Sequence, residues 1–376
     1  MAQKKTVKNF VHRIGHHCES SAMRDLFEFY GFPMSEAMAF GLDATMGFGF
    51  FDIDDMDITK GEVPFFIGGK QGTITPNSLG CRLLGIVLRS QSFTSADKAW
   101  QESKILIDKD SPLILRVDIG YMDFYKHEEE VHFGGHAISL AGYDEDKGVA
   151  YIGDTQFEGF QEIPIDRLKE ARNSEHGSKF MLPKNTQFSM ERRSDGKHPP
   201  LAAGAKLAIQ QVCSNMLRPS IRHNGLQGIK LFASVIPKWK DKLRGNTTNP
   251  YSGKEISLAR LIFELTHGYI ETWGTGGGAF RILYKEFLAE LLNNPELKEG
   301  QRAWTKEEFN ILEESVPIIS KSAENWTIVA KTLKNAVDDY KAEFLFHVDL
   351  DELHDIVLTI HNREEELFKK LSKIKN

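Results

Sequence analysis

The chain has 376 residues, of which 41% are hydrophobic and 27% charged, and its formal net charge is −6. These values are typical of a soluble globular protein, and the length allows two ordinary hydrophobic cores. No apolar run approaches the roughly 20 residues of a membrane-spanning helix, so we expect no membrane partner. The negative net charge argues against a nucleic-acid partner.

The N-terminus and the cysteines bear on location. The first residues include lysines but no apolar segment behind them, so they do not resemble a signal peptide. The three cysteines, Cys18, Cys81 and Cys213, lie far apart, a spacing that fits neither a disulfide framework nor a paired-cysteine zinc site. Free thiols without an export signal predict a reducing cytoplasm.

The first half of the chain has the pattern of a helix followed by strands. Apolar residues recur at helical spacing between Ser20 and Tyr30, and a Gly-Phe-Pro sequence then ends the pattern. The segment Pro112–Gly120 is apolar and β-branched, which predicts a strand. The runs Gly134–Tyr143 and Val149–Gly153 flank a polar turn and predict a β-hairpin. We therefore expect an α+β domain with an antiparallel sheet.

A domain boundary is expected within the polar, non-periodic stretch Asn173–Pro200. Beyond it the pattern is largely helical, and Thr305 with Glu308 forms a capping box ahead of an apolar run. The sequence therefore predicts a catalytic domain over residues 1–190 and a mainly α-helical domain over residues 191–376.

Two features of the second half are suited to anions. Between Leu201 and Pro250, eight Lys or Arg residues stand against one acidic residue, a local balance of +7. A solvated helix face is the alternative explanation of this stretch. The loop Gly274–Gly278 precedes a patterned helix with Arg281 in its first turn, where an anion could bind. The loop matches no nucleotide-binding motif, and close helix packing explains it equally well.

Cys18 is the candidate nucleophile. It lies at the start of the first predicted helix, and the positive end of a helix favours the thiolate form of a cysteine. The thiolate is the form that attacks acyl groups. A buried structural cysteine is the alternative.

His136 and Asp154 are the candidate partners of this thiol. His136 opens the first hairpin strand behind two glycines, and Asp154 follows the second strand. A turn centred near Asp146 places Ile138 opposite Asp154, which brings Asp154 close to the His136 end of the pair. An acid there can orient the imidazole and stabilise its charged form. A satisfied core histidine is the alternative at position 136.

Other histidines near these residues are candidate metal ligands. His16, His17 and Cys18 are consecutive, and His132 precedes His136 by four residues. Consecutive residues of an extended segment point to opposite faces, and no fourth ligand is evident, so we expect no metal.

Asp118 and Tyr121 follow the predicted strand Pro112–Gly120 and could line the same cleft. There they would recognise an amine, and a polar pair that ends the strand is the alternative. With His17 and Arg281, they make up the expected substrate-binding residues.

Five segments of the first half carry a resemblance to a known family: His17-Cys-Glu-Ser-Ser21, Phe40-Gly-Leu42, Gly47-Phe-Gly-Phe50, His132-Phe-Gly-Gly-His136 through Asp144, and Asp154-Thr155. They resemble the N-terminal domain of the butirosin biosynthesis protein H family. Two segments of the second half, Trp273 through Arg281 and Ala323-Glu-Asn-Trp326, resemble the helical domain of unknown function that is usually fused behind it.

The resemblance implies a papain-like fold and the transfer of an acyl group from an acyl-carrier-protein thioester to a small amine. A similar papain-like enzyme forms the amide bonds to a diamine in closthioamide biosynthesis. Papain-like enzymes usually carry, six residues before the cysteine, a glutamine that helps to bind the oxyanion. This sequence has His12 there, which puts that donor in doubt.

These patterns together predict an amide-forming acyltransferase with the triad Cys18, His136 and Asp154. The phosphopantetheine would arrive on the donor protein, so no cofactor of the chain itself is expected. A cysteine peptidase or amidohydrolase with the same triad is the alternative enzyme. A binding module that kept the fold is the alternative outside enzymes, and the complete Cys/His/Asp set argues against it.

Overall fold

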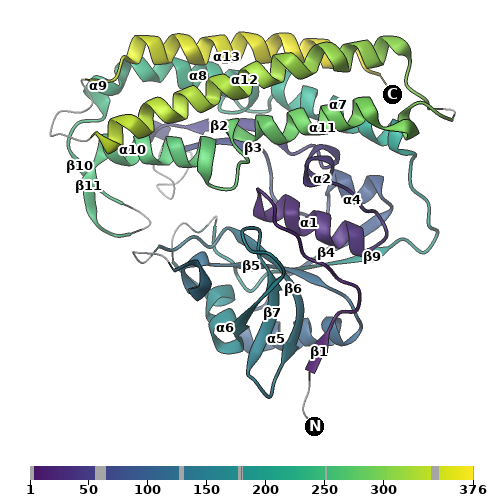
Figure 1. Ribbon diagram of the computed structural model, residues 1–376. Coiled ribbons are helices and arrows are strands. Elements are labelled where there is room, and N and C mark those ends of the chain that lie inside the picture. The colour runs from purple at the N-terminus through teal and green to yellow at the C-terminus, as the bar shows by residue number, and fades with distance from the viewer. Residues whose placement is uncertain are drawn as a thin grey trace. The chain divides into compact units, whose positions relative to one another are not determined.

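The computed structural model in Figure 1 describes residues 4–55, 65–126, 131–176, 179, 181–249, 252–300, 302–339 and 347–375. The chain forms two compact units. The first comprises Met1–Ala39, Thr73–His198 and Pro250–Gly253, and the second Phe40–Gly72, Pro199–Asn249 and Lys254–Asn376. This division differs from the expected 1–190 and 191–376, because residues 40–72 pack with the helical unit.

The first unit is built on an antiparallel sheet with strand order β4-β9-β5-β6-β7-β8, and β1 pairs with β6. The strands are β1 (Lys4–Thr6), β4 (Ile86–Gln91), β5 (Leu113–Val117), β6 (His136–Asp144), β7 (Val149–Gly153), β8 (Phe160–Pro164) and β9 (Gln187–Arg192). The helices are α1 (Cys18–Phe29), α4 (Leu79–Leu83), α5 (Ala96–Asp108) and α6 (Ile165–Asn173), while α2 (Glu36–Leu42) crosses the boundary between the units. The expected α+β class, first helix and hairpin are confirmed.

Strand β9 was not expected, because it lies in the stretch that the sequence indicated as a polar boundary. It pairs with both β4 and β5 and is therefore internal to the sheet. Phe188 and Met190 alternate along it and are each 3% exposed. This alternation is flanked by polar residues on both sides, so it does not stand out in the sequence.

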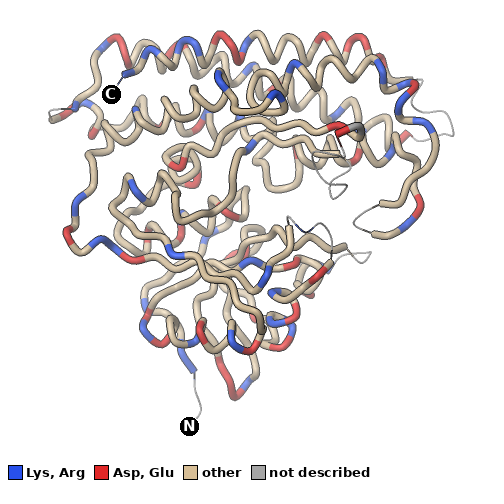
Figure 2. Tube along the Cα trace, turned by 180° about the vertical axis from the view of Figure 1, so that it is seen from behind, with Lys and Arg blue, Asp and Glu red and all other residues tan. Residues whose placement is uncertain are grey.

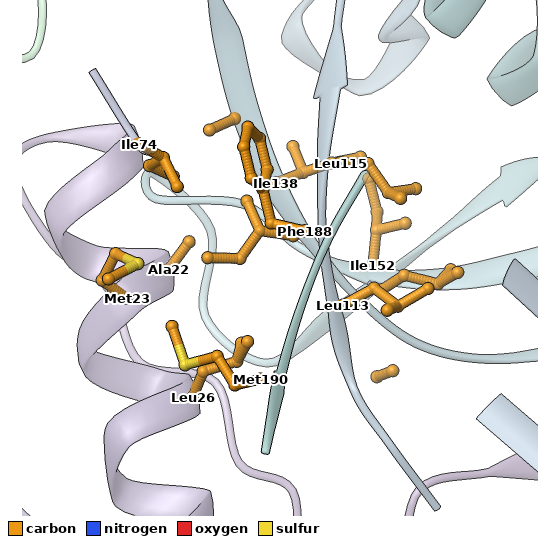
Figure 3. Packing of buried hydrophobic residues seen from close by; sticks show 14 of the residues in the cluster. Ala22, Met23, Leu26, Ile74, Leu113, Leu115, Ile138, Ile152, Phe188 and Met190 are labelled. Carbon is orange, nitrogen blue, oxygen red and sulfur yellow. The ribbon is translucent and has the colours of Figure 1, made fainter. Parts of the chain in front are cut away.

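The core of the first unit fixes α1 against the sheet. Figure 3 shows Ala22, Met23 and Leu26 of α1 near apolar side chains of the sheet. Those labelled on the sheet are Leu113, Leu115, Ile138, Ile152, Phe188 and Met190. Burial of each large side chain contributes about 1.5–3 kcal/mol. The helix that begins at Cys18 is thus held along its length.

The second unit is mainly helical and includes two small hairpins. Its helices are α7 (Leu201–Leu217), α8 (Gly225–Val235), α9 (Trp239–Lys242), α10 (Leu258–His267), α11 (Arg281–Asn293), α12 (Lys306–Asp338) and α13 (Leu350–Leu371). Its strands are β2 (Met46–Phe51), β3 (Phe66–Lys70), β10 (Asn246–Thr248) and β11 (Glu255–Ser257).

The long helices α12 and α13 lie side by side (Figure 1), and acidic and basic residues are interspersed along them (Figure 2). The capping box of Thr305 and Glu308 at the start of α12 is confirmed. Along the described part of the chain, no helix combines the length and the apolar character that crossing a bilayer would require.

A buried ion pair lies at the centre of the second unit. Arg281 and Glu364 are both 0% exposed, and two guanidinium nitrogens donate to the carboxylate at 2.8 Å each. Arg281 also donates to the Gly47 carbonyl at 2.9 Å, which ties α11 and α13 to the β2–β3 hairpin. Ser322 Oγ (2.6 Å) and Trp326 Nε1 (3.1 Å) donate to the same Glu364 oxygen. Since every partner is supplied from within this unit, the pair is a structural junction.

Glu364→Ala should lower the free energy of unfolding by about 3–5 kcal/mol, because it leaves the Arg281 charge buried without a counterion. The neighbouring Glu365→Ala is the matched control, since the pair that Glu365 makes with Lys369 is exposed to solvent. Urea unfolding of both variants measures the difference. Equal stability of the two would show that the buried pair is not a junction.

Candidate active site

The segment that leads into Cys18 is held by hydrogen bonds to one carboxylate. Glu36 accepts from the backbone N–H groups of His16 (2.7 Å) and His17 (2.8 Å), and from Ser20 Oγ (2.7 Å). His17 is the N-cap of α1, and its Nδ1 accepts from the Ser20 N–H at 3.2 Å. The imidazole of His17 thus has a capping role, and Cys18 occupies the first position of the helix.

The β6–β7 hairpin brings His136 and Asp154 together. Ser139 pairs with Gly153, so the start of β6 lies beside the end of β7. His136 Nε2 lies 2.7 Å from Asp154 Oδ2, and the two residues are 7% and 0% exposed. Cys18 is also near enough to this imidazole to raise its pKa. Because Asp154 engages Nε2, Nδ1 is the ring nitrogen left for the sulfur.

The electrostatics of this group favour a charged imidazole. Burial lowers the pKa of His136, but the Asp154 carboxylate and Cys18 outweigh it and raise the pKa to about 10. Burial also raises the pKa of Asp154, yet His136 and the Tyr125 hydroxyl outweigh it and hold that pKa below its usual value. His136 is therefore an imidazolium at neutral pH, and an adjacent cation stabilises a thiolate.

Tyr125 completes the surroundings of Asp154 and was not singled out by the sequence. Its hydroxyl donates to Asp154 Oδ1 at 2.6 Å. Its ring stands edge-on to the His136 ring, with centroids 6.1 Å apart. Burial, followed by the Asp154 charge, raises the pKa of Tyr125, so the hydroxyl remains a donor. No local motif marks this residue, because its role arises only when the loop after β5 folds over the hairpin end.

Asp118 does not have the predicted substrate-binding role. Its carboxylate is 0% exposed and accepts from Gly120 N (3.0 Å), Phe133 N (2.9 Å), Ser174 Oγ (2.5 Å) and His132 Nδ1 (2.8 Å). These four donors occupy both carboxylate oxygens, which leaves no room there for a substrate amine. Asp118 instead fits the alternative, a polar residue at the end of the strand, because it holds the chain that follows β5.

Tyr121 is engaged in a separate aromatic group. The Arg167 guanidinium lies 5.0 Å from its ring centroid, and the His132 ring lies 5.6 Å away. His132 in turn stacks on His176 with centroids 3.8 Å apart. Within the described ranges, no three His, Cys, Asp or Glu residues gather as metal ligands.

Arg281 and its glycine loop were expected to meet an anion, and the structure corrects this. Arg281 is fully buried on Glu364. The N–H of Gly278 donates to Glu271 Oε2 at 3.0 Å, and the N–H of Gly277 donates to the Thr275 hydroxyl at 3.0 Å. A Cβ on Gly278 would come within 3.0 Å of Ala323. Close helix packing, the alternative explanation, accounts for the glycines.

The basic stretch 201–250, whose last residue lies outside the described residues, is partly neutralised. Among the described residues, three cations of this stretch pair with acidic residues from outside it. A count of the charges within 201–250 does not include these acidic residues. These pairs are Lys206–Glu308 (2.6 Å), Lys242–Asp52 (3.1 Å) and Arg222–Asp55 (3.9 Å). The balance of +7 therefore overstates the attraction of this surface for an anionic partner.

Comparison with known families finds two family models that match consecutive parts of the chain. The family model described as "Butirosin biosynthesis protein H, N-terminal" matches residues 17–155, a range that begins one residue before Cys18 and includes His136 and Asp154. The model described as "Domain of unknown function (DUF4872)" matches residues 166–371, more than half of the chain. No curated protein matches. The chain belongs to the butirosin biosynthesis protein H family, with its characteristic helical domain behind the N-terminal one.

Proposed function

We propose that the protein is a cysteine-dependent N-acyltransferase with a papain-like catalytic unit. One observation carries the proposal: Cys18, at a helix start, interacts with an imidazole whose other nitrogen lies 2.7 Å from a buried carboxylate. A thiol, a base and an orienting acid in this order form the catalytic triad of cysteine acyl-transfer enzymes.

The first step is acylation of the enzyme. The Cys18 thiolate attacks the thioester carbonyl, the bond from carbon to the donor sulfur breaks, and His136 gives its proton to the departing thiolate. The products are acyl-Cys18, the free donor thiol and a neutral imidazole. The backbone N–H of Cys18 is proposed to donate to the oxyanion, because it lies at the helix start next to the nucleophile.

The second step transfers the acyl group. The amine attacks the acyl-Cys18 carbonyl, His136 takes the amine proton, and the bond to sulfur breaks. The products are an amide, a Cys18 thiolate and an imidazolium, which is the starting state. Amide formation from a thioester is downhill, so the cycle requires neither a nucleotide nor a metal.

The donor is proposed to be an acyl-carrier-protein thioester, and the acceptor a small amine or diamine. The family name refers to butirosin biosynthesis, which supports a role in natural-product biosynthesis. A peptidase or amidohydrolase would use the same three residues, so what distinguishes the two functions is whether an amine or water attacks acyl-Cys18.

Incubation with an acyl-carrier thioester should add one acyl group to the protein, and a diamine should then remove it as an amide. Intact-protein mass spectrometry follows the adduct, and the ratio of amide to free acid measures the partition. Cys18→Ala should prevent the adduct, whereas Cys213→Ala, which changes a buried thiol, should not. Acid as the only product at a saturating amine concentration would indicate a hydrolase, and an adduct on Cys18→Ala would remove the nucleophile assignment.

Asp154→Asn should lower the acylation rate by about 10²–10⁴-fold, because a neutral amide no longer stabilises the imidazolium. Tyr125→Phe is the matched comparison, since it removes one hydrogen bond to Asp154 and keeps the charge. Tyr125→Phe should lower the acylation rate roughly 10- to 100-fold, because one hydrogen bond to a charged group is lost. Single-turnover acylation measures both, and an Asp154→Asn enzyme at least as fast as Tyr125→Phe would contradict the orienting role.

A further inference from the structure

His12 lies six residues before Cys18 in the extended segment that leads to α1, and it is 4% exposed. Its ring has acceptors on both sides. Nδ1 lies 2.6 Å from Asp25 Oδ2, while Nε2 lies 2.8 Å from the Asp154 carbonyl oxygen and 3.1 Å from that of Phe157. A neutral imidazole has one N–H, so satisfying both sides requires the doubly protonated ring.

The charge of this ring is compensated within the protein. Asp25 is buried, and its second oxygen accepts from Arg24 Nε at 2.9 Å and from Arg24 Nη2 at 2.7 Å. Burial lowers the pKa of His12, but Asp25 and the Asp154 carbonyl outweigh it, so the net pKa lies above the usual value. Asp25 thus shares its one negative charge between His12 and Arg24, and Arg24 also donates to the Ile14 carbonyl at 3.1 Å.

The geometry excludes an oxyanion role for His12. Both ring nitrogens are already directed at Asp25 and at backbone carbonyls, so no N–H remains for a substrate oxygen. The packing favours this orientation, since a Cβ on Gly153 would come within 2.5 Å of His12 Cγ. Glycine at position 153 therefore lets the ring approach the end of β7.

What His12 holds is the turn that carries the catalytic acid. The Asp154 carbonyl also accepts from the Phe157 N–H at 3.0 Å, so the ring binds both ends of this turn. Thr155 in the same turn accepts from the Gly15 N–H at 2.9 Å, and its hydroxyl lies 2.9 Å from Ser21 Oγ. The turn is thus anchored to the segments on either side of Cys18.

We propose that His12 is a positioning residue that clamps the Asp154 turn and so keeps the Asp154 carboxylate on His136 and His136 on Cys18. The proposal rests on the triad of the proposed function. It predicts that loosening the clamp weakens the thiolate–imidazolium pair even though residue 12 touches neither partner.

Two substitutions of His12 test the contacts on the two sides of its ring separately. Asn at position 12 can keep a donor near the Nδ1 position, toward Asp25, and lose the one toward the Asp154 carbonyl. Gln can keep a donor near the Nε2 position, toward that carbonyl. The readout is the pH dependence of Cys18 alkylation by iodoacetamide, followed on the Cys18 peptide by mass spectrometry. This readout needs no knowledge of the natural substrate.

His12→Asn should slow alkylation at about pH 6 roughly tenfold or more, the change that one pKa unit produces, and shift the profile to higher pH. His12→Gln should restore part of the wild-type profile. His354→Asn is the matched control, because His354 also meets a backbone carbonyl (Ala233, 2.8 Å) but lies in the second unit. It should change the melting temperature without moving the profile.

An unchanged profile in both His12 variants, with an activated wild type, would overturn the clamp and leave the proposed function standing. Slower thioester turnover with an unchanged alkylation profile would overturn it in favour of an oxyanion role. A wild-type Cys18 that reacts like an ordinary thiol would overturn the proposed function, and the inference with it.

Discussion

The catalytic account depends on one contact, the 2.7 Å hydrogen bond between His136 Nε2 and Asp154 Oδ2. A carboxylate with no exposed surface is stable as an anion only if donors surround it. Asp154 has the imidazolium on one oxygen and Tyr125 on the other. The anion in turn helps to keep the ring charged, because it raises the pKa of His136.

This dependence explains why the site is built on rigid elements. The register of β6 and β7 fixes the distance between base and acid, and the packing of α1 on the sheet fixes the nucleophile. Backbone contacts then hold the turn after β7 and the segment before α1. A displacement of about 1 Å in a catalytic group can cost on the order of 10² in rate, so such support has a functional effect.

Both units contain buried charged groups that pair with each other, but these groups have different consequences. The Arg24–Asp25–His12 group contacts the backbone of Asp154, and we propose that it constrains the position of this residue. The Arg281–Glu364 pair joins helices and a hairpin within the second unit, where it explains why an arginine after a glycine loop is unavailable to a ligand. A charged residue in a sequence therefore indicates a binding site only if no other residue of the same protein pairs with it.

The proximity of His136 and Asp154 could be predicted because both residues belong to one hairpin. The hairpin is short, so the position of its turn determines which strand residues face each other, and the observed pairing of Ser139 with Gly153 agrees with the expected proximity of His136 and Asp154. The errors concern long-range partners. Arg281 and Glu364 are separated by 83 residues, and the cage around Asp118 includes a serine 56 residues away. No local pattern shows such a partner, and for the same reason the packing of β2 and β3 with the helical unit was not expected.

The central claim, that Cys18 and His136 form an ion pair held by Asp154, is tested most directly by the protonation state of the His136 ring. Nuclear magnetic resonance of ¹⁵N-labelled histidine can follow this ring, with His136→Asn identifying its signals among those of the 13 histidines. The account predicts two protonated ring nitrogens from neutral pH until the pH passes about 10. It also predicts an earlier loss of the proton in Cys18→Ala, which removes the negative partner. A wild-type ring that is already neutral at about pH 7, with Cys18 reduced, would contradict the account.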